Sequence, residues 1–477
     1  MKKYTSLKLK YFPTFLILIA FSVMTSCSDN DDVLPDDPQN EQTEDDDPEA
    51  VSCIEFQVAI GGNDADIVNQ TITTSDGNYL LIGASKSNIS GDKSEASRGD
   101  LDFWVVKMNG NGDVLWDKTI GGDAADVAYA GLETPDGGFL IGGYSRSGTS
   151  GDKAEPNLGE PDLWLVKLSS SGSLEWEEAY GGSGYEEIRA LGLAADGNYI
   201  IGSSSNSPAS SDKAEDSLGD IESLDFWLLK VDTDGNILWE NTIGANKTDR
   251  LYDMAVTAEN EILMVGSSIS DAGFDKTEPS QGVSDYWIVK AAANGTPIWD
   301  ETFGGTENEL VSRLLLLADG SFVVSGSTFS NTSGDITQDN NGEIDYFAAA
   351  FSSSGSPLWQ NTLGTEFSDQ TLTVNQLSDG SFILGGYSSA GISGDKTQEN
   401  QGFFDIWLTA LDANGELINE LSLGALGNDY VSDIVPTADG SFLVIGHSTG
   451  DISGDKTVAN LGAEDFWILK LGCLDAD

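Results

Sequence analysis

The chain has 477 residues, with 55 glycines, 12 prolines and a formal net charge of −56 at pH 7. This charge excludes nucleic acid and anionic membrane surfaces as partners, because both would be repelled. It leaves cations, neutral glycans and other proteins open as partners. Frequent glycine, serine, threonine and aromatic residues, without helical periodicity after the first 27 residues, predict an all-β chain of short strands and turns.

Residues 1–26 are predicted to be a secretory signal peptide. Four lysines precede an apolar core over residues 12–23, which is too short for a settled transmembrane span. The end of the segment, Met-Thr-Ser-Cys at 24–27, resembles a bacterial lipobox. The resemblance implies that Cys27 is acylated and that the protein is a lipoprotein held to a membrane through its lipid. The alternative is an ordinary cleavage site that lies beside a cysteine.

Residues 27–50 are predicted to be a disordered acidic tether. Positions 28–50 hold 11 carboxylates, no lysine or arginine, three prolines and almost nothing apolar. They cannot bury enough surface to offset the entropy of the chain. The run Ser-Asp-Asn-Asp-Asp at 28–32 resembles the acidic surface-export signal of Bacteroidota lipoproteins, which implies the outer face of the outer membrane. The alternative is a generic solvated linker.

Residues 51–477 contain seven repeats with a period of 60 residues, lengthened once to 63. Each repeat predicts four strands, a to d in chain order, with a long b–c loop and tight a–b and c–d turns. All 11 tryptophans fall in strands c and d, as expected for aromatic packing between neighbouring sheets. The predicted fold is a seven-bladed β-propeller of four-stranded antiparallel blades. A glycine precedes strand a of each repeat: Gly61, Gly121, Gly181, Gly244, Gly304, Gly364 and Gly424.

The last repeat stops after strand c, near residues 466–470, and the missing strand d is at the other end of the chain. Residues 54–60 have the pattern of a strand d, with Phe56 in the tryptophan position. We therefore expect this N-terminal strand to close the last blade and remove the open edges. Cys53 and Cys473 would then lie at the seam, where they form a disulfide in an oxidising compartment or remain two free thiols.

Acidic residues recur at three positions on the rim of the disc that carries the d–a and b–c connections, which we call the long-loop rim. They lie five residues after the anchoring glycine, in the b–c loop, and at the start of strand c. One interpretation is that they cap loop amides, as in Asx-turns. The other is calcium binding, since Ca²⁺ takes about six to eight oxygen ligands, although a lysine follows the loop aspartate in six repeats. The candidate metal ligands are Asp92, Asp152, Asp212, Asp275, Asp335, Asp395 and Asp455.

Residues that differ between repeats are better candidates for a specific site, because equivalent blades do not supply different catalytic roles. The sequence has no Ser-His-Asp set, no His/Cys metal cluster and no phosphate-binding glycine loop, so we predict no catalytic residue. His447, the only histidine, is expected to be structural. Aromatic residues on the long-loop rim either bind a ligand or anchor loops: Tyr185, Phe367, Phe403, Phe404 and Tyr430.

The repeated pattern Gly-Gly…Asp-Gly…Ser-Gly-Asp-Lys…Asp-Phe-Trp…Lys…Gly…Trp, over residues 53–473, resembles that of Bacteroidota surface-lipoprotein β-propellers, some described as bulb-lectin-like. Residues 232–239 are also similar to the tryptophan-docking motif of quinoprotein-type propellers. The resemblance implies the propeller fold and this lineage. It implies no particular activity.

These features lead to one functional hypothesis and two alternatives. The leading hypothesis is a monomeric outer-membrane lipoprotein, facing the cell exterior, that binds or scaffolds a protein or glycan through the acidic long-loop rim without catalysis. One alternative is a glycan lyase or hydrolase, with asymmetric carboxylates near the central channel as acid and base. The other is an accessory subunit of an outer-membrane uptake or secretion complex. Calcium is the one cofactor considered.

Overall fold

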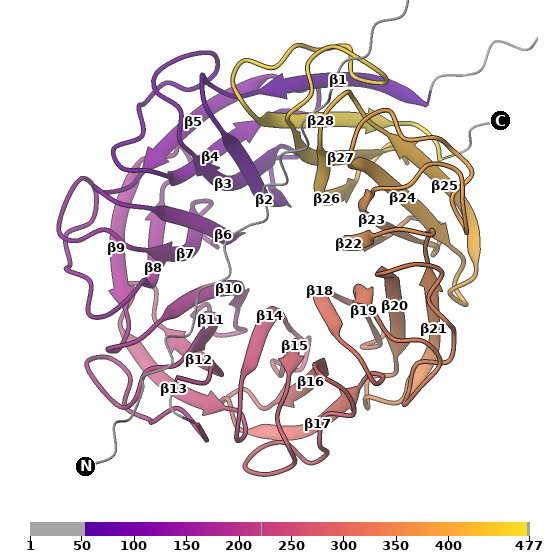
Figure 1. The fold of residues 1–477 in the computed structure, drawn as a ribbon. Coiled ribbons are helices and arrows are strands. Elements are labelled where there is room, and N and C mark those ends of the chain that lie inside the picture. The colour runs from indigo at the N-terminus through magenta and orange to yellow at the C-terminus, as the bar shows by residue number, and fades with distance from the viewer. Residues whose placement is uncertain (1–52, 221, 475–477) are drawn as a thin grey trace, which may run out of the picture. The chain divides into compact units, whose positions relative to one another are not determined.

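A computed structural model describes residues 53–220 and 222–474. These residues form 28 strands in seven four-stranded sheets, arranged as blades around an axis (Figure 1). This part of the chain contains no helix, and so none that could cross a membrane. The predicted all-β, seven-bladed propeller is therefore confirmed. The predicted signal peptide, the lipidation site at Cys27 and the acidic tether lie outside the described residues.

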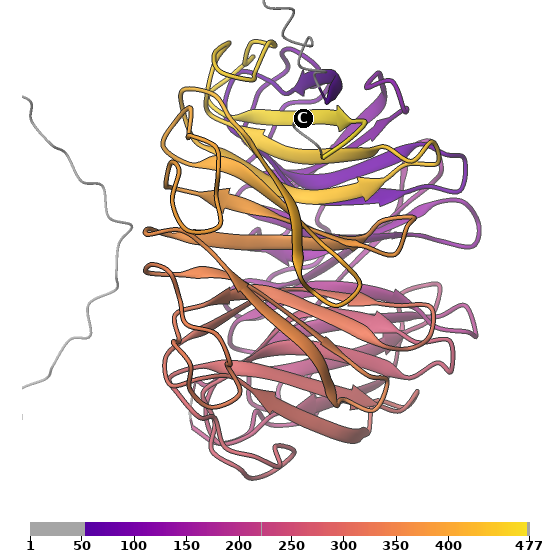
Figure 2. The same cartoon turned by 90° about the vertical axis from the view of Figure 1, so that its right-hand side faces the viewer.

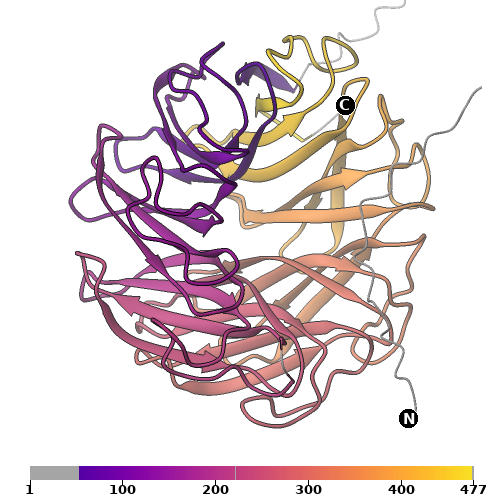
Figure 3. The same ribbon diagram turned by 60° about the vertical axis from the view of Figure 1, so that its left-hand side comes forward.

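Each blade is an antiparallel meander with strand a innermost and strand d outermost, and its twist is clearest from the side (Figure 2) and in the oblique view (Figure 3). The a strands are β2 (Asp66–Thr73), β6 (Asp126–Glu133), β10 (Glu186–Leu193), β14 (Asp249–Val256), β18 (Glu309–Leu316), β22 (Asp369–Gln376) and β26 (Asp429–Pro436). The b strands are β3 (Tyr79–Ser85), β7 (Phe139–Ser145), β11 (Tyr199–Ser205), β15 (Ile262–Ser268), β19 (Phe322–Thr328), β23 (Phe382–Ser388) and β27 (Phe442–Ser448).

The two outer strands of each blade form the wider part of the disc. The c strands are β4 (Asp102–Met108), β8 (Asp162–Leu168), β12 (Asp225–Val231), β16 (Asp285–Ala291), β20 (Asp345–Phe351), β24 (Asp405–Leu411) and β28 (Asp465–Leu471). The d strands are β5 (Val114–Ile120), β9 (Leu174–Tyr180), β13 (Ile237–Ile243), β17 (Pro297–Phe303), β21 (Pro357–Leu363), β25 (Leu417–Leu423) and, from the other end of the chain, β1 (Ile54–Ile60).

The ring closes where β1 pairs antiparallel with β28, so that the indigo and yellow ends of the described chain lie side by side (Figure 1). Gln57 of β1 completes the blade, because its Oε1 accepts the indole N–H of Trp467 at 3.1 Å and the amide of Thr457 at 2.9 Å. Glu177 has the same double role in the second blade. The predicted closure by the N-terminal strand is confirmed.

Cys53 and Cys473 form the predicted disulfide across this seam, with their Cα atoms 5.2 Å apart. The expectation of two free thiols is wrong. The bond joins residues separated by 420 positions, so it restricts the unfolded chain over almost its whole described length. On the loop-entropy account, such a long loop gives a disulfide its largest stabilising effect.

Replacing both cysteines, Cys53→Ser with Cys473→Ser, is expected to lower the Tm in non-reducing buffer. The loop-entropy account puts the loss at up to roughly 5 kcal/mol, and native-state strain reduces it. Calorimetry of the oxidised protein, the reduced protein and the double variant measures the effect. Reduction should lower the Tm of the natural protein and leave the variant unchanged. Equal melting temperatures for all three would contradict a stabilising seam.

The hydrophobic core lies between neighbouring blades. Trp164 of β8 packs against Phe103 of the preceding blade, with ring centroids 4.9 Å apart. The strand d tryptophans, such as Trp116, are only partly buried. An aromatic residue at the third position of strand c is buried in every blade: Trp104, Trp164, Trp227, Trp287, Phe347, Trp407 and Trp467. The strand c aromatics therefore have the packing role that the sequence predicts.

Candidate functional site

The acidic residue at the first position of each repeat caps the d–a loop. In the second blade, Asp126 Oδ2 accepts the amide of Gly122 at 2.7 Å and the hydroxyl of Ser147 at 2.9 Å. The residues at this position are fully buried: Asp66, Asp126, Glu186, Asp249, Glu309, Asp369 and Asp429. They hold the d–a loop against the start of the b–c loop and are closed off from solvent.

The b–c loop aspartates, the candidate metal ligands, bind the anchoring glycine of their own blade. Asp152 Oδ2 accepts the amide of Gly121 at 3.2 Å, and the Asp152 amide donates to the Gly121 carbonyl at 3.0 Å. The glycine-to-carboxylate hydrogen bond recurs in all seven blades at 3.0–3.4 Å. The structure thus contains the caps that the first interpretation of these residues predicts.

The lysine that follows the loop aspartate points inward. Lys93 is 2 % exposed, donates to Thr119 Oγ1 at 2.6 Å, and places Nζ 5.1 Å from the ring centroid of Trp104. Desolvation lowers the pKa of this ammonium group to about 8. The lysine therefore ties the loop to the core through a cation–π contact.

The third acidic position explains why each repeat needs its anchoring glycine. Asp162 Oδ2 accepts the amide of Leu158 at 2.6 Å, while its buried Oδ1 has no hydrogen-bond partner and faces the glycine of the next blade. A Cβ on Gly181 would lie 2.6 Å from that oxygen. Any larger residue would push the two blades apart.

Calcium at the b–c loops stays a prediction. Among residues 53–220 and 222–474, no three His, Cys, Asp or Glu side chains are grouped so that they could hold a metal ion. Calcium binding would require the loop carboxylates to exchange a glycine amide for the cation. It should then raise the Tm in CaCl₂ and lower it in EDTA, as measured by calorimetry with MgCl₂ as the control. Identical melting temperatures in all three solutions would contradict calcium binding at the b–c loops.

Pairs of buried carboxyl groups lie at the blade junctions, where strand c of one blade meets strand a of the next. Burial raises the pKa of Asp345 to about 7, and the nearby Asp369 adds to the shift. Burial likewise raises the pKa of Asp102 and Asp162 to about 6 and that of Asp225 to about 8. The folded protein therefore holds protons on these groups at a pH where the unfolded chain has released them.

The junction carboxyls make folding stability depend on pH. A carboxyl whose pKa is raised by folding contributes stability that is complete below its unfolded pKa of about 4 and is lost as pH rises through its folded value. We expect the Tm to fall between pH 5 and pH 8. Asp345→Asn keeps an oxygen for the loop cap but cannot ionise, so it should reduce this fall.

Thermal melting across this pH range measures the effect. Asp234→Asn, which changes an exposed carboxyl in a c–d turn, is the matched control and should retain the full pH dependence. A Tm that stays level or rises from pH 5 to pH 8 would contradict the assigned role of the junction pairs.

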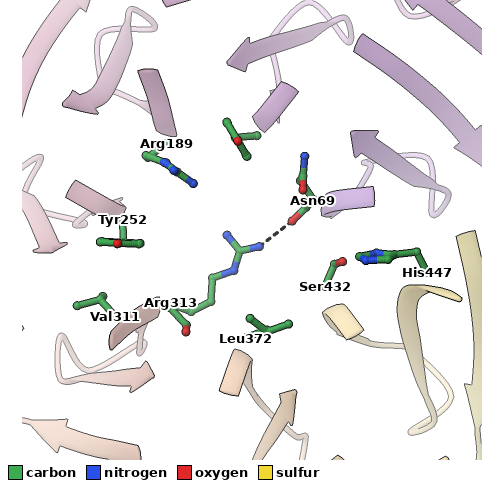
Figure 4. Close-up of a pocket in the computed structure, with 10 residues that line it drawn as sticks. Asn69, Arg189, Tyr252, Val311, Arg313, Leu372, Ser432 and His447 are labelled. Atoms are coloured by element: carbon green, nitrogen blue, oxygen red, sulfur yellow. Dashed lines mark hydrogen bonds between the residues drawn. The ribbon is translucent and has the colours of Figure 1, made fainter. Parts of the chain in front are cut away.

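Residues that differ between blades meet at a cavity of about 310 Å³ between the inner strands. Each a strand has a β-bulge at its fourth residue, which leaves that residue unpaired and re-aims its side chain. These bulge residues line the cavity together with Val311, Arg313 and His447 (Figure 4). They are Asn69, Tyr129, Arg189, Tyr252, Ser312, Leu372 and Ser432.

An arginine network extends along one side of the cavity. Arg189 Nη2 donates to Glu187 Oε2 at 3.0 Å, and Arg250 Nε donates to Glu187 Oε1 at 2.9 Å. Burial acts to raise the pKa of Glu187, but the two arginines hold it below its ordinary value. The Arg189 guanidinium also lies 4.4 Å from the ring centroid of Tyr129. Glu187 is therefore an ionised partner of the arginines and is not available as an acid.

Arg313 of β18 crosses the cavity to β2, where its Nη2 donates to the carbonyl of Asn69 at 2.9 Å (Figure 4). Two carboxyls on the inner strands, Asp253 and Asp433, contribute negative charge near this guanidinium. Burial raises the pKa of both carboxyls.

Asp253 and Asp433 are held by the backbone. Asp253 accepts the amides of Leu314 at 2.9 Å and Met254 at 2.8 Å. Asp433 accepts the amide of Thr71 at 3.0 Å from the neighbouring blade. These two residues bridge adjacent inner strands, and their oxygens are engaged in doing so.

Three of the five predicted ligand-binding aromatics come together beside the cavity. Phe403 and Phe404 have ring centroids 4.7 Å apart, and Tyr430 follows 6.0 Å from Phe404. Tyr430 in turn lies 5.2 Å from the ring of His447, which lines the cavity. Phe403 is 68 % exposed, so the cluster leads from the surface of a b–c loop to the cavity. Tyr387, between Phe404 and Tyr430, completes it.

The other two predicted aromatics lie elsewhere. The Tyr185 hydroxyl donates to Glu187 Oε2 at 2.7 Å, so this residue belongs to the arginine network. Phe367 is 52 % exposed on the loop between β21 and β22.

His447 is a neutral, mostly buried side chain. It is 15 % exposed, and desolvation lowers its pKa to about 4. Its Nδ1 is buried without a hydrogen-bond partner, and its Nε2 lies 3.6 Å from Glu464 Oε1. The expectation that His447 is purely structural therefore leaves out its place in the cavity wall.

Sequence reasoning missed the bulge residues and Arg313. The signal for the bulge residues is the fourth position of strand a, which changes residue type from blade to blade while the first position remains Asp or Glu. A second signal is composition. Three of the five arginines in the chain, Arg189, Arg250 and Arg313, fall on inner strands.

No protein-family model matches the chain. The regulatory protein FlaEY of Caulobacter vibrioides is 26 % identical over 205 residues, which cover 40 % of this chain and 21 % of that protein. The chain thus matches about a fifth of the length of this relative.

Several solved structures resemble the chain at low similarity. Hydrazine synthase of Kuenenia stuttgartiensis has a TM-score of 0.46 at 11 % identity, covering 81 % of this chain and 94 % of that one. BamB of Moraxella catarrhalis has a TM-score of 0.38 at 12 % identity, covering 87 % and 99 %. A Bacteroides caccae protein of unknown function has a TM-score of 0.38 at 12 % identity, covering 72 % and 93 %. Such likenesses carry no information about function, and the Bacteroidota lipoprotein family stays a prediction.

Proposed function

We propose that this protein is a lipid-anchored, surface-facing outer-membrane propeller that binds a protein or glycan, and preferably a glycan, without catalysing a reaction. One observation carries the proposal. The acidic residues repeated in every blade are engaged in capping, whereas the residues that differ between blades converge on one cavity. Specific recognition needs unlike groups at defined places, and the cavity is where this sevenfold repeat supplies them.

Binding fits the cavity better than catalysis. A glycan hydrolase or lyase needs one carboxyl that is free to give a proton and another group that is free to take one. Three carboxyls on the inner strands are engaged otherwise: Glu187 by two arginines, and Asp253 and Asp433 by backbone amides. His447 is held neutral by burial, so it supplies no positive charge at pH 7.

A glycan fits the chemistry of the wall. The amide of Asn69 and the hydroxyls of Ser312 and Ser432 donate to backbone carbonyls of the next blade, so their oxygens are available as acceptors. Tyr129 and Tyr252 present aromatic faces with a polar edge. Such groups complement the alternating hydroxyls and C–H faces of a sugar. A volume of about 310 Å³ is at the small end of the range for ligand pockets, which suits one or two sugar units.

A protein ligand is the second candidate, because Phe403 and Leu426 line a separate hollow of about 380 Å³ on the long-loop rim together with polar residues. Phe403 is 68 % exposed there and Leu426 is 74 % exposed. Exposed aromatic and aliphatic residues of this kind are common anchors in protein interfaces.

A glycan array probed with the full-length protein in detergent tests the proposal. We expect binding to a defined set of glycans and an affinity about tenfold lower or weaker still for Tyr252→Ala, because a stacking face in the wall is lost. Phe274→Ala, a change of an exposed aromatic residue on another b–c loop, is the control and should bind normally. Absence of binding to any glycan contradicts glycan recognition, and loss of a membrane-protein pull-down in Phe403→Ala would then favour the protein ligand.

The proposed location depends on Cys27 and on the acidic residues at 28–32. Cys27→Ala should abolish labelling by a radioactive fatty acid and release the protein from membranes. Replacing the three aspartates of residues 28–32 by alanine should retain the lipid but remove antibody access on intact cells. Labelling of the Cys27→Ala variant would contradict the lipoprotein assignment.

A further inference from the structure

Resting on the proposed glycan-binding function, we infer that the bound sugar carries a carboxylate, and that the guanidinium groups of Arg189 and Arg313 hold this carboxylate in the cavity. The ligand class is thus an acidic sugar, with either a uronic or a sialic type of acid as its source. Both guanidinium groups point into the cavity, from β10 and β18 (Figure 4).

The placement of arginine in this chain is selective. Only five of 477 residues are arginine, and three of these are on inner strands. The lysines, by contrast, recur in the b–c loops and at the end of strand c, where they have repeated structural partners such as Thr119 for Lys93 and Asp76 for Lys107. Arginine differs from lysine in presenting a planar fork of donors that matches a carboxylate with two parallel hydrogen bonds.

The two arginines retain donors that the protein leaves free. Arg189 Nη2 donates to Glu187 and its Nη1 has no hydrogen-bond partner among the described residues, whereas Arg189 Nε is unpaired but closed off from solvent. Arg313 makes one hydrogen bond among the described residues, from Nη2 to the carbonyl of Asn69. A ligand carboxylate that accepts from the open terminal nitrogens of these arginines forms charge-assisted hydrogen bonds that the folded protein lacks.

The charge around the cavity leaves room for an anion. Glu187 is shared between Arg189 and Arg250, so it neutralises one of them and not both. The two carboxyls near Arg313 have backbone amides as partners, and burial raises the pKa of both Asp253 and Asp433.

The remainder of the molecule restricts the anion to one with little charge. A net charge of −56 repels a polyanionic chain before it reaches the cavity. A phosphate dianion would also meet the ionised Glu187, which is bonded to Arg189. A single carboxylate on a sugar ring can accept the paired N–H groups of a guanidinium and adds only one negative charge. A sugar that carries it also fits the cavity volume.

The test compares acidic sugars with uncharged derivatives of the same sugars. The probes are oligosaccharides that end in glucuronic acid or in N-acetylneuraminic acid, their methyl esters, and the corresponding neutral glucose-terminated oligosaccharide. Binding to the full-length protein is measured by calorimetry at fixed ionic strength. We expect at least one acid to bind about 10- to 100-fold more tightly than its methyl ester, the difference expected for charge-assisted hydrogen bonds. Whichever of the two acidic oligosaccharides binds identifies the acid as the uronic or the sialic type.

Matched variants locate the effect. Arg313→Gln and Arg189→Gln should reduce affinity for the acid to that for the ester, and Arg313→Lys should recover only part of it, because it restores charge without the fork. Arg146→Gln removes the same charge from the long-loop rim, where Arg146 lies 3.9 Å from Glu160, and should bind normally. Unchanged melting of the Arg313→Gln and Arg189→Gln variants separates lost binding from lost folding.

Two results would overturn the inference and are distinguishable from each other. If the protein binds neutral glycans as tightly as acidic ones, and both Arg→Gln variants bind normally, the inference that the ligand carries a carboxylate is wrong. The proposed glycan binding would remain. If no glycan binds in either form, the proposed function fails and the inference fails with it.

Discussion

Closure of the ring is the constraint on which the rest of the structure depends. Each blade buries its faces only against its two neighbours, so the seventh blade must be complete for the first to be covered. β1 supplies the missing strand, Gln57 supplies the hydrogen bonds that Trp467 needs, and the Cys53–Cys473 disulfide holds both ends together. Only a closed ring brings seven inner strands around one axis and so creates the cavity.

Part of the large negative charge of the chain comes from carboxylates that hold the loops of the blades in place. Carboxylates at the start of strand a, in the b–c loop and at the start of strand c accept loop amides, and Asp162 also sets the close approach to Gly181. The b–c lysine brings its charge into the core over a tryptophan. The acidic residues of the long-loop rim thus largely cap the amides of their own loops. Burial raises the pKa of those at the blade junctions, so the stability of the junctions depends on pH.

Function in a repeat of this kind depends on departures from the repeat. The bulge at the fourth residue of each a strand frees one side chain per blade from the sheet, and the structure directs it into the cavity. The residue is outside the hydrogen-bonded ladder, so its side chain can vary without breaking that ladder. Arg189, Tyr252 and Asn69 can therefore be unlike one another on a framework that is otherwise uniform, and Arg313 adds a charge beside them.

The sequence by itself determined the blade number, the four-strand unit, the closing strand and the cysteine pair, because these follow from a fixed period and from local strand and turn patterns. It also identified Phe403, Phe404 and Tyr430 as a departure from the repeat. Only the tertiary structure decided that Arg189 and Arg313 share a cavity, that Lys93 is buried, and that His447 joins the cavity wall. Residues more than 100 positions apart meet there because of ring geometry and bulge orientation, and no local pattern in the chain records either.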